Sequence, residues 1–573
     1  MSGFAAHLDF VDGPTAERLR SIADKIAYRG PQGQATRNVG ACTLMHATLW
    51  TTAEAEHENQ PQRHATRDVW LAADARVDNR AELTEMLDGA VQHPLRTDAD
   101  FLLAAYEQWG ADLVDRVVGD FAFALWDGEL EELLVARDPV GVRPLFLAQT
   151  PNGVVAASTL PAVLAGIDGE AGIDETYLAG FLHGLPPRDR TIWSGVERLA
   201  PGHRVRIGRD RVVTERYWMP SLEPLRQPLE TTVELMRTVF DEAVRCRLRT
   251  RDGIACDLSG GLDSSTVTAT TAELATEVHT VSLVYRLDSE AFELPHIEAV
   301  ADHLGLRTNL IEADELTTLD PVADIRTQRE PLYSIDATDT AALFDRASAL
   351  GCSVSLAGVG GDELLYGSTP DRRGIIRQRV SAATVRWAVS RPDGLVARAV
   401  LARRARRARR DRPWLRVSSP LWPVLGRLSS YEAPWGPPGY ELTDRLAAER
   451  GVEVRYPFLD RRLIELGLRL PDDHVRAGDD SRGLHRLAFG QRLPDAVAAR
   501  TDKAEFTGSF SRRIGSSLSS DDVAAALAAL DDRIDVEVVG SAAPWYRWVA
   551  VSAGLFVSSA FARRSPKGSD TFA

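Results

Sequence analysis

The chain has 573 residues and a formal net charge of −15, and 44% of its residues are hydrophobic and 26% charged. That length is too great for a single core and predicts two large domains or three small ones. The acidic balance argues against a dedicated nucleic-acid binder, and four scattered cysteines without a C-x-x-C pair fit a cytoplasmic protein without a zinc or disulfide framework.

The first part of the chain favours short strands separated by tight turns. Apolar, strand-like runs occupy residues 69–73, 121–126 and 133–136, and turn residues such as Gly30 and Pro31 punctuate the sequence. The opening residues, MSGFAAHLDF, lack the charged segment and apolar run of a secretory signal. We therefore expect a β-rich layered domain at this end.

A proline-rich stretch at residues 220–228 marks a linker, and we place the domain boundary just before it, giving domains 1–215 and 216–573. Beyond the linker, the residues from Leu229 to about Arg249 show amphipathic helical periodicity, and residues 254–258 have the pattern of a strand. A glycine-rich turn and a second helix follow. This order predicts an α/β domain with a helical extension.

The turn at residues 259–265 has the sequence SGGLDSS and lies between the predicted strand and the next helix. Paired glycines let backbone N–H groups face an anion, serine hydroxyls add donors, and the helix N-terminus adds positive potential. Asp263 repels phosphate, so we expect it to bind Mg²⁺. The alternative is a plain turn that caps a helix, and the string is not a Walker loop because no G-K-[ST] follows.

Two later segments differ in composition from the rest of the chain, one being strongly basic and the other apolar. Residues 372–416 form a basic insertion containing ARRARRARRDR, typical of a solvated helix face or a partly disordered insertion; docking of an acidic partner and nucleic-acid binding are the alternatives. Residues 548–562 are mostly apolar and uncharged but too few to span a bilayer. We expect a buried helix there and no membrane span.

The turn at 259–265 resembles the PP-loop ATP-binding family, and within it the asparagine synthetases. The resemblance continues in GVGGDEL at 358–364, RYPFLD at 455–460 and RTDKAEF at 500–506, the last with one extra residue before the lysine. Such enzymes cleave ATP between the α and β phosphates and transfer AMP to a carboxylate. The resemblance implies ATP and Mg²⁺ as cofactors and a PP-loop synthetase domain built on a parallel sheet.

The resemblance assigns roles by position. It makes Asp263 and Asp362 the metal ligands, and it places Lys503 on the pyrophosphate or the developing oxyanion, where a fixed positive charge stabilises the transition state. The implied ATP-binding residues are Leu258, Ser259, Gly260, Gly261, Asp263, Ser264, Ser265, Leu283 and Gly358. The reactive pocket would include Val359, Glu330, Glu363 and Asp460, with Glu293 as a further candidate base. A surface turn at Asp362 and an exposed lysine at 503 are the alternatives.

The first domain resembles the family's N-terminal-nucleophile (Ntn) glutaminase, an αββα sandwich. The matching strings are AYRGP at 27–31, NRAEL at 79–83, TDAD at 97–100, VGDFAFALWD at 118–127 and RDPVGVRPL at 137–145. Three departures decide its function. Ser2 stands where working members expose a cysteine, Asp74-Ala75 replaces Asn-Gly, and no arginine near His46 matches the one that binds glutamine. We predict a scaffold without glutaminase activity.

Two branches of the family lack the cysteine, the β-lactam synthetases and the lasso-peptide cyclases. Val359 stands where asparagine synthetases have glutamate and β-lactam synthetases a tyrosine, and valine transfers no proton. A peptide α-amine, with a pKa of ~7.7–8.0, is already partly neutral at pH 7 and can do without a strong base. Chain length, the basic insertion and the Lys503 string look most like lasso cyclases.

The sequence thus predicts a lasso-peptide cyclase that adenylates an Asp or Glu side chain of a core peptide and closes a macrolactam with its N-terminal amine, releasing AMP and pyrophosphate. The resemblance implies a leader-binding protein and a leader peptidase as partners. One alternative is a β-lactam synthetase or an ammonia-dependent asparagine synthetase-like ligase. Another is a non-catalytic peptide-binding adaptor, which would have no reason to need both Asp263 and Asp362.

Overall fold

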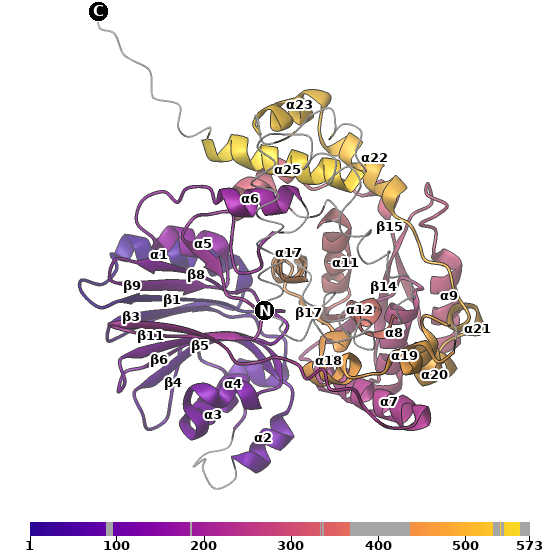
Figure 1. The fold of residues 1–573 in the computed structure, drawn as a ribbon, viewed down its shortest axis with the longest axis horizontal. Coiled ribbons are helices and arrows are strands. Elements are labelled where there is room, and N and C mark those ends of the chain that lie inside the picture. Colours follow the sequence, from indigo (N-terminus) through magenta and orange to yellow (C-terminus); the bar gives the residue numbers. More distant parts are fainter. Residues whose placement is uncertain are drawn as a thin grey trace, which may run out of the picture.

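The computed structural model describes residues 1–573 except 88–94, 184–185, 333, 335–336, 367–435, 479, 531–533, 535–538, 540–543 and 562–573. The basic insertion predicted at 372–416 lies outside the described residues. A layered β domain and an α/β domain lie side by side, and the final helices lie across one end of both (Figure 1).

The N-terminal part contains two six-stranded antiparallel sheets. The first has the order β10-β8-β9-β1-β3-β2 and comprises β1 (Gly3–Asp9), β2 (Gln34–Val39), β3 (Cys42–Ala47), β8 (Phe146–Thr150), β9 (Gly153–Ala157) and β10 (Val196–Arg198). The second has the order β12-β11-β7-β6-β5-β4 and comprises β4 (Gln62–Arg63), β5 (Val69–Val77), β6 (Gly119–Asp127), β7 (Glu132–Arg137), β11 (His203–Gly208) and β12 (Arg211–Arg216). The three predicted apolar runs are confirmed as strands, because they lie within β5, β6 and β7.

Strand periodicity explains the four layers of this domain. In β1, Phe4 and Leu8 pack between the sheets, whereas the alternate residue Ala5 faces the helices outside. The outer face of the first sheet carries α1 (Ala16–Ile26), α5 (Leu160–Gly166) and α6 (Glu175–Leu182). The outer face of the second carries α2 (Arg80–Met86), α3 (Asp98–Trp109) and α4 (Leu113–Arg116). The expected αββα sandwich is confirmed.

The C-terminal part is built on a five-stranded parallel sheet of order β15-β14-β13-β16-β17. Its strands are β13 (Gly253–Asp257), β14 (His279–Val284), β15 (Thr308–Glu312), β16 (Cys352–Leu356) and β17 (Glu453–Arg455). The helices around it are α7 (Leu229–Arg245), α8 (Leu262–Leu274), α9 (Leu294–Leu304), α10 (Pro321–Gln328), α11 (Ala337–Ala349), α12 (Gly361–Leu365), α17 (Gly436–Ala448), α18 (Arg461–Leu468), α19 (Asp472–Arg476), α20 (Gly483–Phe489) and α21 (Asp495–Ala498). The predicted parallel α/β domain is confirmed, although α7 ends before Arg249 because a 3-10 turn covers Cys246–Leu248.

The last described helices are α22 (Thr507–Ser517), α23 (Ser520–Ala528) and α25 (Pro544–Phe561). α25 lies across α6 and α10, and its Phe556 meets Trp193 of the first domain edge-on at 5.4 Å between ring centroids. Trp548 is fully buried in the same core. This confirms the buried helix expected from the apolar stretch, and none of the helices in the described part of the chain is long and apolar enough to cross a membrane.

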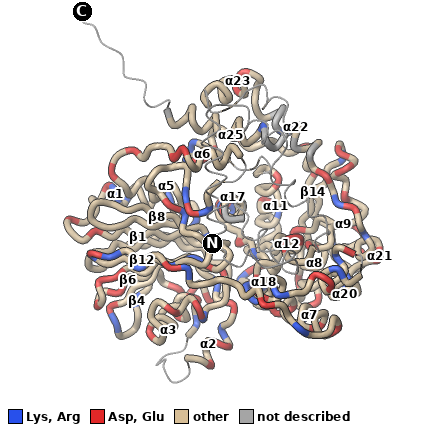
Figure 2. Tube along the Cα trace, viewed as in Figure 1, with Lys and Arg blue, Asp and Glu red and all other residues tan. Residues whose placement is uncertain are grey.

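Acidic and basic residues are interspersed over both domains (Figure 2). Where the domains meet, they form a buried group that we call the interdomain ion cluster. Its members are Arg76, Asp78, Asp120, Arg143, Arg247, Glu453, Arg455 and Asp460. At its centre Glu453 accepts hydrogen bonds from Arg455 at 2.6 Å, from Arg76 at 3.3 Å and from Arg143. Because these charges come from both domains, the cluster ties the domains together.

Candidate active site

The two glycine-rich turns lie together at the carboxyl edge of the parallel sheet. The turn at 259–265 follows β13, and the turn at 358–361 follows its neighbour β16. Leu258 is buried and donates its amide hydrogen to the Val281 carbonyl at 2.9 Å, and Leu283 lies near the end of β14. Parallel strands present their carboxyl ends at one edge, which is where ligands bind in open α/β sheets.

The first turn has the form of an anion cradle. The hydroxyl oxygens of Ser259 and Ser264 are 2.8 Å apart, and the Ser259 amide donates to the Ser264 hydroxyl at 3.2 Å. Gly261 is the N-cap residue of α8 and has no side chain to cap it, so the first N–H groups of this helix remain available. The buried hydroxyl of Ser265 has no hydrogen-bond partner among the described residues. A bound phosphate would accept hydrogen bonds from the uncapped N–H groups at the start of α8.

The turns touch because glycine removes the side chains between them. A Cβ atom at Gly358 would lie 2.6 Å from the amide nitrogen of Ser264, and one at Gly361 would lie 2.3 Å from the Asp263 carboxylate. Both distances are far below a van der Waals contact. The glycines therefore bring the acidic residues of the two turns together.

The sequence prediction paired Asp263 with Asp362, and the structure places their carboxylates on one guanidinium. Arg482 donates to Asp263 through one nitrogen and to Asp362 through the other. Lys503 donates to the second oxygen of Asp362. Two carboxylates that converge on one point beside a phosphate cradle offer the hard oxygen ligands that Mg²⁺ prefers. These residues fit the metal, which would share or replace the position of the Arg482 side chain.

The pKa values of the two aspartates are shifted in opposite directions. Burial raises the pKa of Asp263 to about 6, and the nearby charge of Asp362 adds to this, while Arg482 opposes it. Burial also acts on Asp362, but Arg482 and Lys503 outweigh it and lower the pKa of that carboxyl. In this structure Arg482 and Lys503 thus balance the charge of the two aspartates.

Two functional residues were missed by sequence reasoning, Arg482 and His485. The ring of His485 is fully buried, accepts from Arg482 at 2.8 Å through Nδ1 and meets the Thr266 hydroxyl at 2.9 Å through Nε2. Burial and the neighbouring Arg482 hold the pKa of His485 well below its usual range, so the ring is neutral. These contacts orient Arg482 toward the aspartates. Neither residue lies in a glycine-rich or family-like string, so the sequence carried no signal for them.

The residues expected around the reactive pocket divide into three groups. Val359 is 45% exposed in the second turn and Glu363 follows Asp362 in α12, so both lie at the cradle. Glu330 lines a different pocket, between the domains. Glu293 is paired with Arg500, which donates to it at 2.9 Å.

The assignment of Asp460 to the reactive pocket is wrong. Its side chain is fully buried and accepts from Arg247 at 2.7 Å and from Arg462 at 2.8 and 2.9 Å. It also accepts from the Arg462 amide and so caps α18. These bonds hold the pKa of Asp460 below its ordinary value despite burial. Asp460 belongs to the interdomain ion cluster and has a structural role.

A second pocket surrounds Ser2 in the first domain. Its lining contains Ser2, His46, Asp74 and Arg143 but no cysteine, and the four cysteines are buried elsewhere. Among the described residues, the Ser2 hydroxyl oxygen has the Leu49 amide as its hydrogen-bond partner, at 3.1 Å. The His46 ring bonds instead to the Ala73 carbonyl and the Thr48 hydroxyl, and burial lowers its pKa to about 4. No described base therefore contacts the serine hydroxyl.

Exchanging Gly361 for alanine should disrupt the acid pair, because the new methyl group would overlap the Asp263 carboxylate. We expect magnesium-ATP affinity, measured by calorimetry, to fall at least about tenfold, since a displacement of 1 Å in such a site costs even more in rate. The matched control is Gly439→Ala, where an added Cβ meets open space. Equal affinity in the wild type and the Gly361 variant would contradict the geometry described above.

Comparison with known proteins agrees with this arrangement. The family model described as asparagine synthase matches residues 235–536, and that of the glutamine amidotransferase domain matches residues 1–218. The chain is 26% identical to glutamine-hydrolysing asparagine synthetase 3 of Bacillus subtilis, over 87% of this chain and 86% of that protein. It is 22% identical to asparagine synthetase 1 of that organism, over 84% and 83%. For the amidase chyE of Penicillium rubens the identity is 25%, over 61% of this chain and 55% of that protein.

The fold and the acid-paired cradle define an asparagine synthetase-like, ATP-dependent amide-forming enzyme. Because the matched synthase segment covers more than half of the chain, the protein belongs to the asparagine synthase family. Members of this family generally use ATP and Mg²⁺, and Asp263 and Asp362 are the residues here that would hold the metal.

Proposed function

We propose that this protein is a lasso-peptide cyclase, which joins an Asp or Glu side chain of a core peptide to the peptide's own N-terminal amine. The observation that carries the proposal is a complete acid pair at the cradle in a chain whose Ser2 pocket contains no thiol. Without a thiol, ammonia is not released from glutamine by the usual nucleophile. The nitrogen then has to enter as a substrate amine.

The proposed reaction has two steps. A carboxylate oxygen of the peptide attacks the α-phosphorus of ATP, the bond to the bridging oxygen breaks, and pyrophosphate leaves. The N-terminal amine then attacks the acyl carbon, the bond to AMP breaks, and the nitrogen releases its proton to solvent. Mg²⁺, when bound, supplies positive charge that offsets the charge of the phosphates.

The described residues supply binding and charge for these steps. The donors of the cradle orient the phosphates, and Lys503 adds a positive charge where negative charge develops on the transferred group. Val359 supports a peptide amine as the nucleophile, because it offers no proton acceptor and an α-amine is partly neutral at pH 7. We further propose a leader-binding protein and a leader peptidase as partners, since the amine has to be free before it can react.

The test combines purified protein, Mg²⁺ and ATP with candidate core peptides, free aspartate plus ammonia, and small β-amino acids. A cyclase releases AMP with a peptide and converts that peptide to a product lighter by one water. AMP release with a small amino acid alone would favour β-lactam or asparagine formation. Peptide binding without ATP consumption would favour an adaptor, and release of ADP would overturn adenylation.

Ser2→Ala should leave peptide-dependent AMP release within about twofold of the wild type. Substitutions away from the reacting groups that break no buried network have small effects. The Ser2 hydroxyl contacts the Leu49 amide and no described base. Glutamine should also give no activity with either protein, as measured by glutamate release. Complete loss of activity in this variant would restore a hydrolase role for the first domain.

A further inference from the structure

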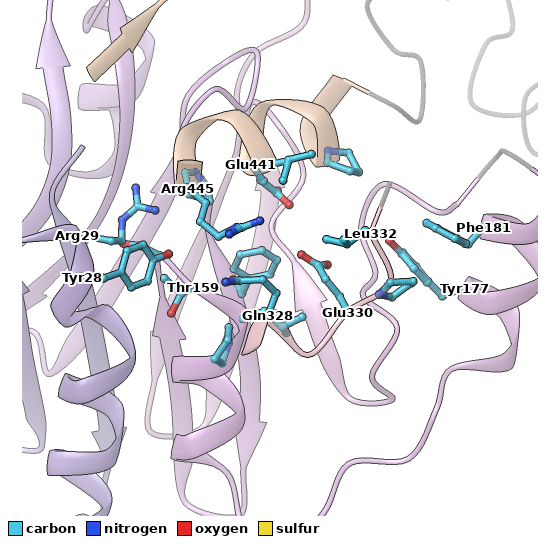
Figure 3. A pocket seen from close by; sticks show the side chains of 18 residues that line it. Tyr28, Arg29, Thr159, Tyr177, Phe181, Gln328, Glu330, Leu332, Glu441 and Arg445 are labelled. Atoms are coloured by element: carbon cyan, nitrogen blue, oxygen red, sulfur yellow. The ribbon is translucent and has the colours of Figure 1, made fainter. Parts of the chain in front are cut away.

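A pocket of about 650 Å³, including its open mouth, lies between the two domains. The first domain contributes aromatic side chains, among them Tyr28, Phe146 and Tyr177. The second domain contributes Glu330 from the segment after α10 and Glu441 from α17 (Figure 3). None of its lining residues belongs to the phosphate cradle.

The cations that line or adjoin this pocket already have partners. Arg29 pairs with Asp444 at 2.6 Å, and Arg445 with Asp324 at 2.7 Å. Arg198 donates from one nitrogen to both oxygens of Glu441, at 2.9 and 2.8 Å. These arginines are therefore poorly suited to recruit an anion.

Glu330 differs from the other charged residues of the pocket. Its side chain is 27% exposed, and its contact with a charged group in the described part of the chain is Arg198 at 3.5 Å, beyond a good hydrogen bond. Figure 3 shows its carboxylate between Gln328 and Leu332, within the ring of lining side chains. A half-buried carboxylate that lacks a full partner favours a ligand that carries a positive charge.

The aromatic side chains Tyr28, Phe146 and Tyr177, which we call the aromatic wall, indicate a second property of the ligand. Tyrosine and phenylalanine rings bind apolar and aromatic groups, and they attract an ammonium group at their faces. Burial, with Glu441 adding and Arg198 opposing, raises the pKa of Glu330 to about 7. An ammonium group beside it would recover the interaction that the carboxylate lacks in this pocket.

We propose that this interdomain pocket binds a primary ammonium group carried on an apolar or aromatic residue. Resting on the function proposed above, we assign it to a residue of the peptide substrate, either its amino-terminal residue or a lysine. The first domain then has a purpose without glutaminase chemistry, because it supplies the aromatic wall that recognises the substrate.

The test measures binding of 2-phenylethylamine to the full-length protein by calorimetry at pH 8, where this amine, like lysine, stays protonated and Glu330 is ionised. We expect Glu330→Gln to weaken binding at least about tenfold, as for loss of a charge-assisted hydrogen bond. Tyr177→Leu should weaken it while keeping the carboxylate. N-acetyl-2-phenylethylamine, which lacks the charge, should not bind. Glu234→Gln, at an exposed carboxylate on α7, is the matched control and should bind like the wild type.

Equal affinity of wild type and Glu330→Gln for the amine, with melting curves showing both folded, would overturn the proposal. So would binding of the acetylated probe as tight as that of the amine. Phe-Gly-Gly and Nα-acetyl-lysine amide, tested in the same way, separate the two sources of the ammonium group. If the amine binds but no peptide releases AMP, the pocket stands and the cyclase proposal fails; if peptides cyclise and the amine does not bind, the reverse holds.

Discussion

Replacing Asp362 with asparagine should reduce peptide-dependent AMP release about a hundred- to a thousandfold, the size of effect seen when a fixed electrostatic group is removed from a reaction centre. Asparagine keeps the shape of the side chain but removes the charge that Arg482 and Lys503 now neutralise. The site would then hold excess positive charge and no anionic metal ligand from the second turn. Asp263→Asn should reduce AMP release to a similar extent, since Asp263 and Asp362 both accept hydrogen bonds from Arg482.

The measurement is AMP and pyrophosphate release by chromatography, together with the melting temperature of each variant. Asp210→Asn, at an exposed turn, is the control for a lost carboxylate and should act like the wild type. AMP release by the Asp362 variant at a tenth of the normal rate or more would show that the acid pair does not serve adenylation.

Glu453→Gln should lower the free energy of unfolding by about 3–5 kcal/mol, the cost of breaking a buried ion pair by removing one partner. The carboxylate of Glu453 accepts from three buried arginines, Arg76, Arg143 and Arg455. Glutamine would leave their charges buried with fewer acceptors. Urea unfolding should give a lower midpoint, whereas Glu234→Gln should change it little.

The pH dependence of stability provides a second check on Glu453. Burial alone would raise its pKa, but Arg455 and Arg143 hold the pKa of this carboxyl well below its ordinary value. A depressed folded-state pKa stabilises the protein above the unfolded pKa of about 4.3 and loses that effect on acidification. The difference between wild type and Glu453→Gln should therefore shrink as the pH falls through the acid range. A constant difference would contradict the ion-pair explanation.

Much of this site could be predicted because each of its turns has its glycines and its aspartate within a few residues of one another in the sequence. Asp263 lies within a glycine-rich turn between a strand and a helix, and Asp362 lies in a second such turn. The neighbouring residues therefore indicate a ligand-binding role for each aspartate. Both turns follow neighbouring parallel strands, and the fold brings them to one edge. Continuous apolar runs also identified β5, β6 and β7, since these strands are buried on both faces.

The rest depends on contacts between distant segments. Arg482 reaches the aspartates from the start of α20, more than a hundred residues after either turn, and nothing local distinguishes it from the many other arginines. Asp460 was misassigned because a family-like string does not show which way its carboxylate points. Glu330 could be named from the sequence, but its pocket could not, because more than half of the lining residues come from the first domain.

The docking of α25 onto α6 makes the stability of each half depend on the other half. Separating the halves within the linker at residues 220–228 would expose Phe556 to water, together with the charges around Glu453. We therefore expect neither half to be stable without the other.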